Sequence, residues 1–266
     1  MKKFLAFSVV LSGIICSFEA CNYFVQENRG NLEVVTAPTL QEEMVPVLKD
    51  SVEKGIYLPT PLVISEIESR ILAAGLVDVK LLDTSIVVDL KYSTSNNFLG
   101  VDMYGDFDKC YLQPDVAEKL ICSQQILKAK FPFYNLIVFD AVRARSIQRK
   151  MWDTIDVPYF EKSKYVSNPN NGSLHNFGAA VDVSIIDEQG IELDMGTPYD
   201  YFGELAYPRE EDRMLGEGKL TRIQLLNRKL LRDVMELGGF MGITTEWWHF
   251  NSCYRTEAYE KYTIIE

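Results

Sequence analysis

The residues best suited to chemistry are the two histidines of the chain, His175 and His249, and an aspartate that follows the first of them. Asp182 lies seven positions after His175 within an apolar run, where an ionised carboxylate is costly to bury unless it is paired or bound to a metal. Catalytic zinc typically has three protein ligands and keeps a fourth position open for water. Two imidazoles and one carboxylate make such a set, so the sequence predicts a zinc site formed by His175, Asp182 and His249.

Glu246 stands three residues before His249, and two tryptophans separate them. A bound metal lowers the pKa of a water molecule toward neutrality, and a neighbouring carboxylate can take the proton of that water and pass it to the leaving amine. In an extended strand, positions 246 and 249 face opposite sides of the sheet. We therefore expect a turn or bulge at the two tryptophans, with Glu246 as the catalytic base.

Two segments resemble the motifs of the zinc D-Ala-D-Ala peptidases. Residues 173–182 (SLHNFGAAVD) are similar to their S-x-H-x-x-G-x-A-x-D motif, and residues 246–250 (EWWHF) are similar to their E-x-x-H segment. Residues 91–100 (KYSTSNNFLG) and 194–200 (DMGTPYD) resemble two further segments of the D-alanyl-D-alanine dipeptidases, a group known from vancomycin resistance. The resemblance extends from about residue 77 to residue 254. It implies a peptidase with one Zn²⁺ per chain that hydrolyses free D-alanyl-D-alanine and is linked to peptidoglycan metabolism.

The same resemblance implies roles for residues around the metal. Arg143 aligns with the arginine that polarises the scissile carbonyl, where a guanidinium would stabilise the oxyanion of the tetrahedral intermediate. Asp140, which we group with the substrate-binding residues, would orient that arginine. Ser173 and Asp200 occupy positions that contact the free ammonium group of the substrate. A carboxylate at Asp200 explains a preference for a free N-terminus, because a blocked peptide would leave it without its cation.

The segment around Arg143 departs from the family pattern. The family usually has G-Y-R-P there, whereas residues 141–144 of this chain are AVRA. The change alters the wall of the pocket and makes Arg145 an alternative for the role of Arg143. A second alternative is that Arg143 only forms a structural ion pair.

Three functions remain open at this point. The first is a D-alanyl-D-alanine dipeptidase, and the second is a D,D- or L,D-carboxypeptidase or endolysin acting on the stem peptides of peptidoglycan. The third is a non-catalytic lipoprotein that binds the cell wall. Asp200 favours the dipeptidase over a carboxypeptidase, since a long peptide would place no ammonium group opposite that carboxylate. Glu246 disfavours the binding protein, which needs no base beside a metal.

Charge and composition narrow the class of partner. Hydrophobic residues make up 47% of the chain and charged residues 24%, as in ordinary soluble globular proteins. The formal net charge of −11 argues against a nucleic acid partner, because the neutralisation of phosphates needs a basic face. A small dipeptide substrate remains compatible with this charge.

The N-terminus carries an export pattern. Two lysines precede an apolar run at residues 4–16, which has the length of a signal-peptide core and is too short to span a bilayer. We therefore expect residues 1–20 to be a signal peptide and the protein to be exported, either to the periplasm or as a membrane-anchored lipoprotein. Cys21 and Cys16 are the candidates for the lipid-bearing residue.

Three cysteines lie beyond this segment: Cys110, Cys122 and Cys253. An exported protein can form disulfides, and Cys110 with Cys122 is the nearest pair; buried thiols are the alternative. No two cysteines have the C-x-x-C spacing, so a zinc site made of thiolates is not supported.

The remaining pattern predicts one α+β catalytic domain behind an N-terminal arm. Residues 21–61 lack a clear period and are expected to form a linker and arm, while residues 62–266 form the domain. Helices and strands are mixed without a regular βαβ order, which favours a central, mostly antiparallel sheet flanked by helices, with the zinc site at the sheet. Helices are expected at residues 62–74, 114–130, 146–152 and 220–237, strands at 85–90, 136–139, 179–186 and leading into 247–250, and a charged inserted loop at 209–217.

Overall fold

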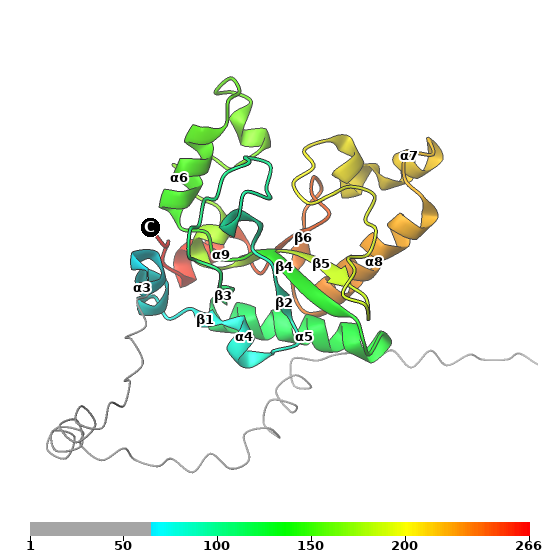
Figure 1. Cartoon of the computed structure of the whole chain (residues 1–266), viewed down its shortest axis with the longest axis horizontal. Helices are drawn as coiled ribbons and strands as arrows, with labels where there is room; N and C mark the ends of the chain where they lie inside the picture. The colour runs from blue at the N-terminus through cyan, green and yellow to red at the C-terminus, as the bar shows by residue number, and fades with distance from the viewer. Residues whose placement is uncertain (1–64) are drawn as a thin grey trace, which may run out of the picture. The chain divides into compact units, whose positions relative to one another are not determined.

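The computed structural model describes residues 65–266 (Figure 1). The expected signal peptide, the linker and arm, and both candidate lipid-bearing cysteines lie outside these residues. Among the helices within residues 65–266, none combines the length and apolar character that a membrane crossing requires.

The central sheet has five strands in the order β2-β4-β5-β7-β6. β4 (Asn135–Asp140) pairs antiparallel with β5 (Ala180–Ile186), β5 pairs antiparallel with β7 (His249–Asn251), and β7 pairs antiparallel with β6 (Met241–Gly242). The one parallel pair among these strands joins β2 (Val87–Val88) to β4. A second sheet joins β1 (Val77–Asp78) to β3 (Tyr111–Leu112). The prediction of a mostly antiparallel sheet in an α+β domain is confirmed.

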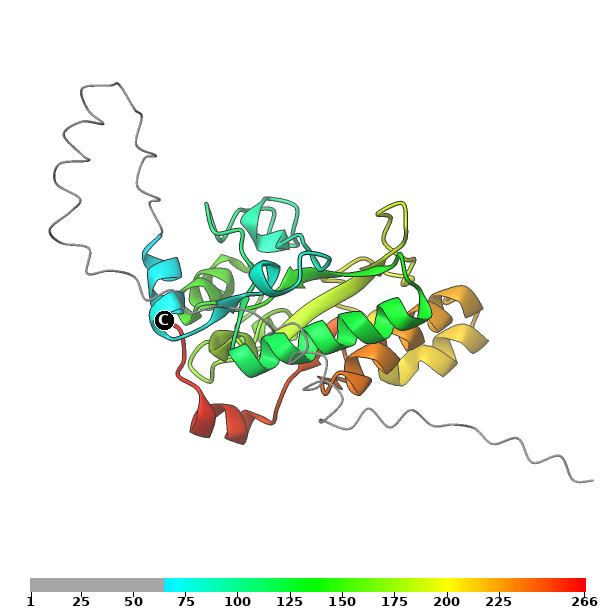
Figure 2. The ribbon, with the colours of Figure 1, turned by 90° about the horizontal axis from the view of Figure 1, so that it is seen from below.

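Two long helices pack on the central sheet and on each other. α5 (Pro114–Lys130) contacts β4, and α8 (Arg222–Leu237) contacts β6. Figure 2 shows α5 crossing in front of β4 and β5, with α8 beside it. The proline that starts α5 suits a first turn, where no backbone donor is needed, and a capping box of Thr221 and Gln224 starts α8. Both helices lie where the sequence predicts them.

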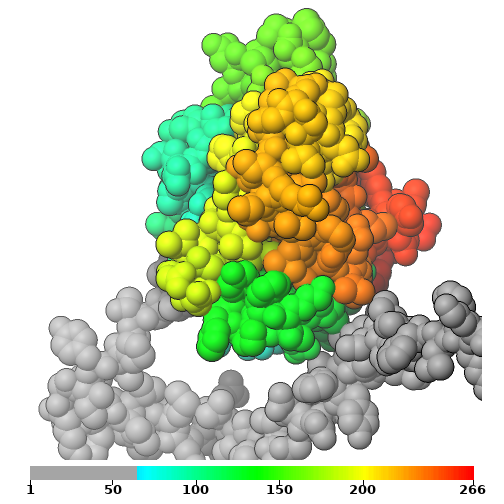
Figure 3. Space-filling view, turned by 90° about the vertical axis from the view of Figure 1, so that its right-hand side faces the viewer, coloured from blue at the N-terminus to red at the C-terminus, as the bar shows by residue number. Residues whose placement is uncertain are grey.

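The other helices of the described chain are short. The α-helices are α3 (Glu66–Ala73), α4 (Val79–Leu82), α6 (Arg145–Thr154), α7 (Glu211–Gly216) and α9 (Arg255–Lys261). The 3-10 helices are η1 (Lys91–Ser93), η2 (Lys162–Lys164), η3 (Leu174–Phe177), η4 (Glu204–Ala206) and η5 (Pro208–Glu210). Figure 3 shows the face that α7 and α8 form together, in gold and orange.

Two expectations differ from the structure in their details. The strand expected at residues 85–90 is limited to Val87–Val88, because the chain turns into η1 soon after its pairing with β4. Residues 209–217, expected as an irregular loop, are largely helical in η5 and α7. Glu211 and Met214, one turn apart, are both buried there. Burial against the rest of the fold, rather than a long periodic pattern, stabilises this short helix.

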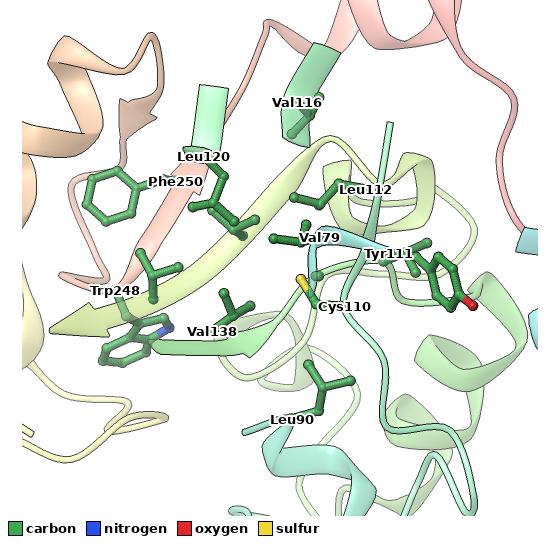
Figure 4. Packing of buried hydrophobic residues seen from close by; sticks show 14 of the residues in the cluster. Val79, Leu90, Cys110, Tyr111, Leu112, Val116, Leu120, Val138, Trp248 and Phe250 are labelled. Atoms are coloured by element: carbon green, nitrogen blue, oxygen red, sulfur yellow. The ribbon is translucent and has the colours of Figure 1, made fainter. Parts of the chain in front are cut away.

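A hydrophobic core holds the strands that carry the predicted site residues. Leu120 of α5, Val138 of β4 and Phe250 of β7 belong to it together with Trp248, and each is at most 1% exposed (Figure 4). Full burial of a side chain such as Leu or Phe contributes about 1.5–3 kcal/mol to stability. The core therefore fixes β4, β5 and β7 relative to one another, and with them the residues at their ends.

Cys110 is a buried thiol in the same core (Figure 4). In the structure Cys110 is a free thiol and forms no disulfide with Cys122, in line with the alternative of a buried thiol. Burial raises the pKa of this thiol far above its usual value, so it stays protonated and chemically inert.

Candidate active site

The strand register brings two of the predicted metal ligands side by side. Asp182 of β5 pairs directly with His249 of β7 in the antiparallel ladder. His175 lies on η3, the turn that leads into β5. Gly178 ends this turn with a φ of 65°, a left-handed backbone conformation that glycine adopts without steric cost. The sheet and the turn thus bring the three side chains to one point.

The three ligand atoms form a small triangle. His175 Nε2 lies 3.2 Å from His249 Nδ1 and 3.4 Å from Asp182 Oδ1. The third side, from His249 Nδ1 to Asp182 Oδ1, is 2.9 Å. Zinc bonds of about 2.0–2.1 Å at tetrahedral angles separate ligand atoms by about 3.3 Å. The group of His175, Asp182 and His249 could therefore hold a metal ion.

Hydrogen bonds on the far side of each ring orient the two imidazoles. His175 Nδ1 lies 2.7 Å from the backbone oxygen of Ala141. A carbonyl oxygen only accepts, so Nδ1 donates and the lone pair of Nε2 faces the other ligand atoms. His249 Nε2 lies 2.9 Å from Asn251 Oδ1, which turns Nδ1 inward in the same way. Two such nitrogens and one carboxylate oxygen are a donor set that suits zinc.

Asp182 is also held through its second oxygen. Tyr199 donates its hydroxyl hydrogen to Asp182 Oδ2 at 2.9 Å, and Arg143 Nη2 lies 3.9 Å from the same oxygen. Burial favours the neutral acid, but the adjacent His175 and His249 outweigh it and hold the pKa of Asp182 well below its usual value. The side chain is therefore ionised, which is the form that binds metals.

A cleft of about 640 Å³ opens over this triangle. Its volume lies within the range of about 300–1,000 Å³ that small-molecule sites occupy. The cleft is lined by the three ligand candidates together with Arg143, Ser173, Asp200 and Glu246. Of the residues that the sequence assigns to the site, only Asp140 is absent from this lining in the described part of the chain.

Glu246 reaches the cleft because the chain bends just before β7. Residues 247 and 248 are bends rather than strand, as the sequence predicts, and Glu246 and His249 both line the cleft. Trp247 and Trp248 are buried, and Trp247 Nε1 donates to Thr197 Oγ1 at 2.8 Å. The tryptophans thus anchor the bend in the core while the residues on either side of them face the cleft. Burial raises the pKa of Glu246 above its usual value.

Arg143, and not Arg145, lies in the cleft. Arg143 Nε donates to Asp140 Oδ2 at 2.8 Å, and the backbone N–H of Arg143 donates to His175 O at 3.0 Å. Arg145 pairs instead with Glu266 at the end of the chain. The geometry removes Arg145 as an alternative, and it shows that Arg143 forms a buried ion pair and lines the cleft as well.

Asp140 lies behind Arg143 and has no exposed surface. Its Oδ1 accepts a hydrogen bond from the Tyr104 hydroxyl at 2.5 Å, and its Oδ2 accepts from Arg143. Both carboxylate oxygens are therefore occupied inside the protein. Asp140 thus holds Arg143 from behind and does not line the cleft.

Ser173 and Asp200 line the cleft from different segments. Ser173 donates its hydroxyl hydrogen to Gln148 Oε1 at 2.9 Å, which leaves the oxygen able to accept. Asp200 Oδ2 accepts a hydrogen bond from the Tyr92 hydroxyl at 2.9 Å. Burial, with the nearby charge of Asp182, raises the pKa of Asp200 well above its usual value. A cation bound beside Asp200 would offset both effects and favour the carboxylate.

The sequence interpretation does not identify three residues that support the site. Tyr92 and Tyr199 lie in the family-like segments 91–100 and 194–200, but nothing in those segments says that their hydroxyls meet Asp200 and Asp182. For Asn251, the sequence does contain a signal that could have predicted its contact with His249. Asn251 follows His249 by two positions on a strand, so the two side chains share one face of the sheet.

The glycine that ends η3 gives a first testable prediction. A Cβ on Gly178 would lie 2.6 Å from Leu76 Cδ2, and the backbone there has a φ of +65°. Gly178→Ala is therefore expected to lower the free energy of unfolding by about 2–4 kcal/mol, which combines backbone strain with the displacement of a buried leucine. Denaturant unfolding of the two proteins measures this loss.

Gly190 provides the matched control. It has a similar φ of +76°, but a Cβ there would meet nothing within 4 Å. Gly190→Ala should cost only the backbone strain of about 1–2 kcal/mol. Equal losses in the two variants would mean that contact with Leu76 is not what restricts position 178 to glycine.

The family model and the relatives that match this chain all carry the same description. A family model described as D-ala-D-ala dipeptidase matches residues 72–263. The D-alanyl-D-alanine dipeptidase of Escherichia coli (strain K12) is 31% identical over 175 residues, which cover 66% of this chain and 83% of that protein. The D-alanyl-D-alanine dipeptidase of Enterococcus faecium is 26% identical, with 61% and 83% covered. The D-alanyl-D-alanine dipeptidase of Synechocystis is also 26% identical, with 53% and 68% covered.

Proposed function

Because the chain belongs to the D-ala-D-ala dipeptidase family, we propose that it is a zinc-dependent peptidase that hydrolyses free D-alanyl-D-alanine to two D-alanines and serves peptidoglycan metabolism. One observation carries the chemistry of this proposal. His175, Asp182 and His249 meet within coordination distance in a cleft that Glu246 and Asp200 also line.

The three converging atoms, His175 Nε2, His249 Nδ1 and Asp182 Oδ1, would hold the zinc ion. When bound, zinc would polarise the scissile carbonyl as a Lewis acid and lower the pKa of a water molecule. The protein keeps this ligand set in place through Ala141 O and Asn251 Oδ1, which orient the imidazoles.

Glu246 would serve as the base and then as the acid. Its carboxylate would take a proton from the attacking water as the oxygen of that water adds to the carbonyl carbon. The same proton would go to the nitrogen of the second residue as the C–N bond breaks, so one water is consumed and two amino acids leave. The bend at the buried Trp247 and Trp248 holds Glu246 in the lining of the cleft.

Arg143 would stabilise the oxyanion that forms on the former carbonyl oxygen. Its guanidinium is held by Asp140 and lies over the Tyr92 ring, with the ring centroid 5.1 Å away. A donor fixed in this way needs little reorganisation as charge develops, which is the condition under which such donors contribute most. The neighbours Ala141, Val142 and Ala144 are all buried, so the altered AVRA segment is part of the core.

Asp200 and Ser173 would bind the free ammonium group of the dipeptide. The cation would give Asp200 a charge-assisted partner in a buried setting, and the Ser173 oxygen would accept a second hydrogen bond. An acylated nitrogen is neutral and bulkier, so it would leave the Asp200 carboxylate without compensation. This arrangement favours a dipeptidase over a carboxypeptidase that acts on long stem peptides.

We also propose that the protein is exported, to the periplasm or as a lipoprotein anchored through Cys21 or Cys16. The support is the lysine-led apolar run at residues 4–16. Labelling of the full chain with a radioactive or clickable fatty acid in cells tests the anchor, with Cys21→Ala and Cys16→Ala as the two variants.

The experiment that tests the activity compares free D-Ala-D-Ala with N-acetyl-D-Ala-D-Ala. The zinc-loaded protein is expected to hydrolyse the free dipeptide with a kcat/KM at least about 100-fold higher, because the acetyl group removes the partner of a buried carboxylate. Release of D-alanine is followed with a D-amino acid oxidase assay. Equal rates on both substrates would contradict the dipeptidase proposal and favour a carboxypeptidase.

Asp200→Asn is the matched variant for this test. Asparagine has nearly the same size and tolerates the left-handed conformation that position 200 adopts, with a φ of 60°. Its rate on the free dipeptide should fall while its rate on the acetylated dipeptide stays unchanged. A full preference for the free dipeptide in this variant would exclude Asp200 from ammonium binding.

A further inference from the structure

The loop of residues 195–205 carries two of the hydroxyl and carboxylate groups that shape the cleft. Tyr199 holds Asp182, and Asp200 faces the cleft with its side chain bonded to Tyr92. The loop follows β5, has no regular secondary structure up to residue 203, and ends within η4. Its shape must therefore be fixed by contacts with other parts of the fold.

One side chain of α8 binds both ends of this loop. Arg228 Nε donates to Met195 O at 2.6 Å, and Arg228 Nη2 donates to Leu205 O at 2.9 Å. Arg228 as a whole is 1% exposed. The planar guanidinium presents its donors in a rigid fork, so it fixes the distance between the two carbonyl groups as well as their orientation.

The burial of Arg228 is costly for the fold. Glu211 of α7 is the nearest carboxylate at 3.7 Å, and it is already bonded through both oxygens to Arg232. Within residues 65–266, Nη1 of Arg228 finds no hydrogen-bond partner. Desolvation lowers the pKa of Arg228 to about 10 in spite of Glu211. A buried apolar residue would fill this space at lower cost, so the packing of α8 alone does not account for the arginine.

The loop that Arg228 binds is strained at Asp200. Its φ of 60° makes it the only non-glycine residue within 65–266 that has a left-handed backbone. A conformation of this kind persists only where the surrounding structure holds it in place. The bonds of Arg228 to residues 195 and 205 supply such a constraint, because they bracket Asp200 from both sides.

We propose that Arg228 is a positioning residue for substrate recognition, which clamps the loop of residues 195–205 so that Asp200 meets the ammonium group of the dipeptide. This inference rests on the proposed function. In it, Asp200 contacts the ammonium group, and Arg228 of α8 holds the loop that carries Asp200. Arg228 is not among the residues that line the cleft. It acts through the backbone of residues 195 and 205.

The test replaces Arg228 with methionine in the full-length, zinc-loaded protein. Arg228→Met keeps much of the volume and the unbranched shape but removes both carbonyl contacts. We expect KM for D-Ala-D-Ala to rise about 10-fold to 100-fold, which corresponds to the loss of a charge-assisted contact at Asp200. We expect kcat to change less than about 5-fold and the preference for the free over the acetylated dipeptide to fall by the same factor as KM rises.

Arg232→Met is the matched control. Arg232 lies one turn further along α8 and shares Glu211 with Arg228, but it bonds to neither end of the loop. Its KM and its preference for the free dipeptide should equal those of the unmodified protein. If Arg228→Met and Arg232→Met change KM equally, or if Arg228→Met lowers kcat alone, the proposal is overturned.

Arg228→Lys covers the case in which the methionine variant does not fold. Lysine retains the charge opposite Glu211 but can bond only one carbonyl in a fixed direction. It should raise KM by a smaller factor and leave zinc content and kcat unchanged, and an unchanged KM would overturn the proposal. If the unmodified protein itself fails to hydrolyse D-Ala-D-Ala, the proposed function fails. If it succeeds while every Arg228 variant keeps its selectivity, only the present inference fails.

Discussion

Glu246→Gln is expected to lower kcat for D-Ala-D-Ala by at least about 10³-fold and to leave one zinc ion bound per chain. Glutamine has the size of glutamate but accepts no proton at neutral pH, so the variant loses both proton transfers. General acid–base groups contribute about 10²–10⁴-fold each, and Glu246 would act in both the addition and the cleavage step. Single-turnover kinetics separates this chemical step from product release.

Two controls accompany the Glu246 variant. Glu188→Gln removes an exposed carboxylate outside the cleft and should leave kcat unchanged. Zinc content, measured by atomic absorption, distinguishes a base from a ligand. If Glu246→Gln loses its zinc, Glu246 is a ligand and the base must be sought elsewhere in the cleft.

Removal of one imidazole is the second change with a large expected effect. His249→Ala should reduce the bound zinc from one per chain to nearly none and lower activity to the background rate. Two remaining ligands do not make the three-ligand set of a catalytic site, and the open position would be filled by water. Zinc should also raise the unfolding temperature of the unmodified protein but not that of this variant, because only a native state with an intact site gains from the ligand.

Asn251→Ala provides a graded comparison for the histidine variant. Asn251 binds the outer nitrogen of His249 and does not reach the ligand triangle. The loss of such an outer partner typically weakens metal affinity by about 10–100-fold, so zinc should still bind at higher concentration. Treatment of the unmodified protein with a chelator should abolish activity, and added Zn²⁺ should restore it. Full zinc occupancy in His249→Ala would contradict the assigned ligand set.

The large elements of the fold could be predicted because each carries its own signals. The helix Pro114–Lys130 begins with a proline that suits a first turn, and five of the seven residues of the strand Ala180–Ile186 are apolar, which suits a strand buried on both faces. The two-residue strand Val87–Val88 and the short helix Glu211–Gly216 lack such signals. Contacts with distant parts of the chain decide their conformation, and a local pattern does not contain those contacts.

In the site, too, some features have local sequence signals and others depend on distant contacts. The types of its ligands and their motifs predict that His175, Asp182 and His249 converge, and the structure brings their atoms within 4.8 Å of one another. The choice between Arg143 and Arg145, two basic residues separated by Ala144, depends on the pairing of Arg145 with the distant Glu266, which a local pattern does not contain. Arg228 gives no sequence signal at all, since an arginine in an amphipathic helix usually faces water.

The register of β5 and β7 has a consequence for folding. Asp182 and His249 face each other in the ladder, so a shift of the pairing by one residue would turn one of them to the opposite face of the sheet. A misaligned pair of these strands would offer the ion only two ligands, so binding of the ion would hardly stabilise it. Zinc binding would therefore stabilise the correct pairing of β5 and β7 over pairings shifted by one residue while the protein folds.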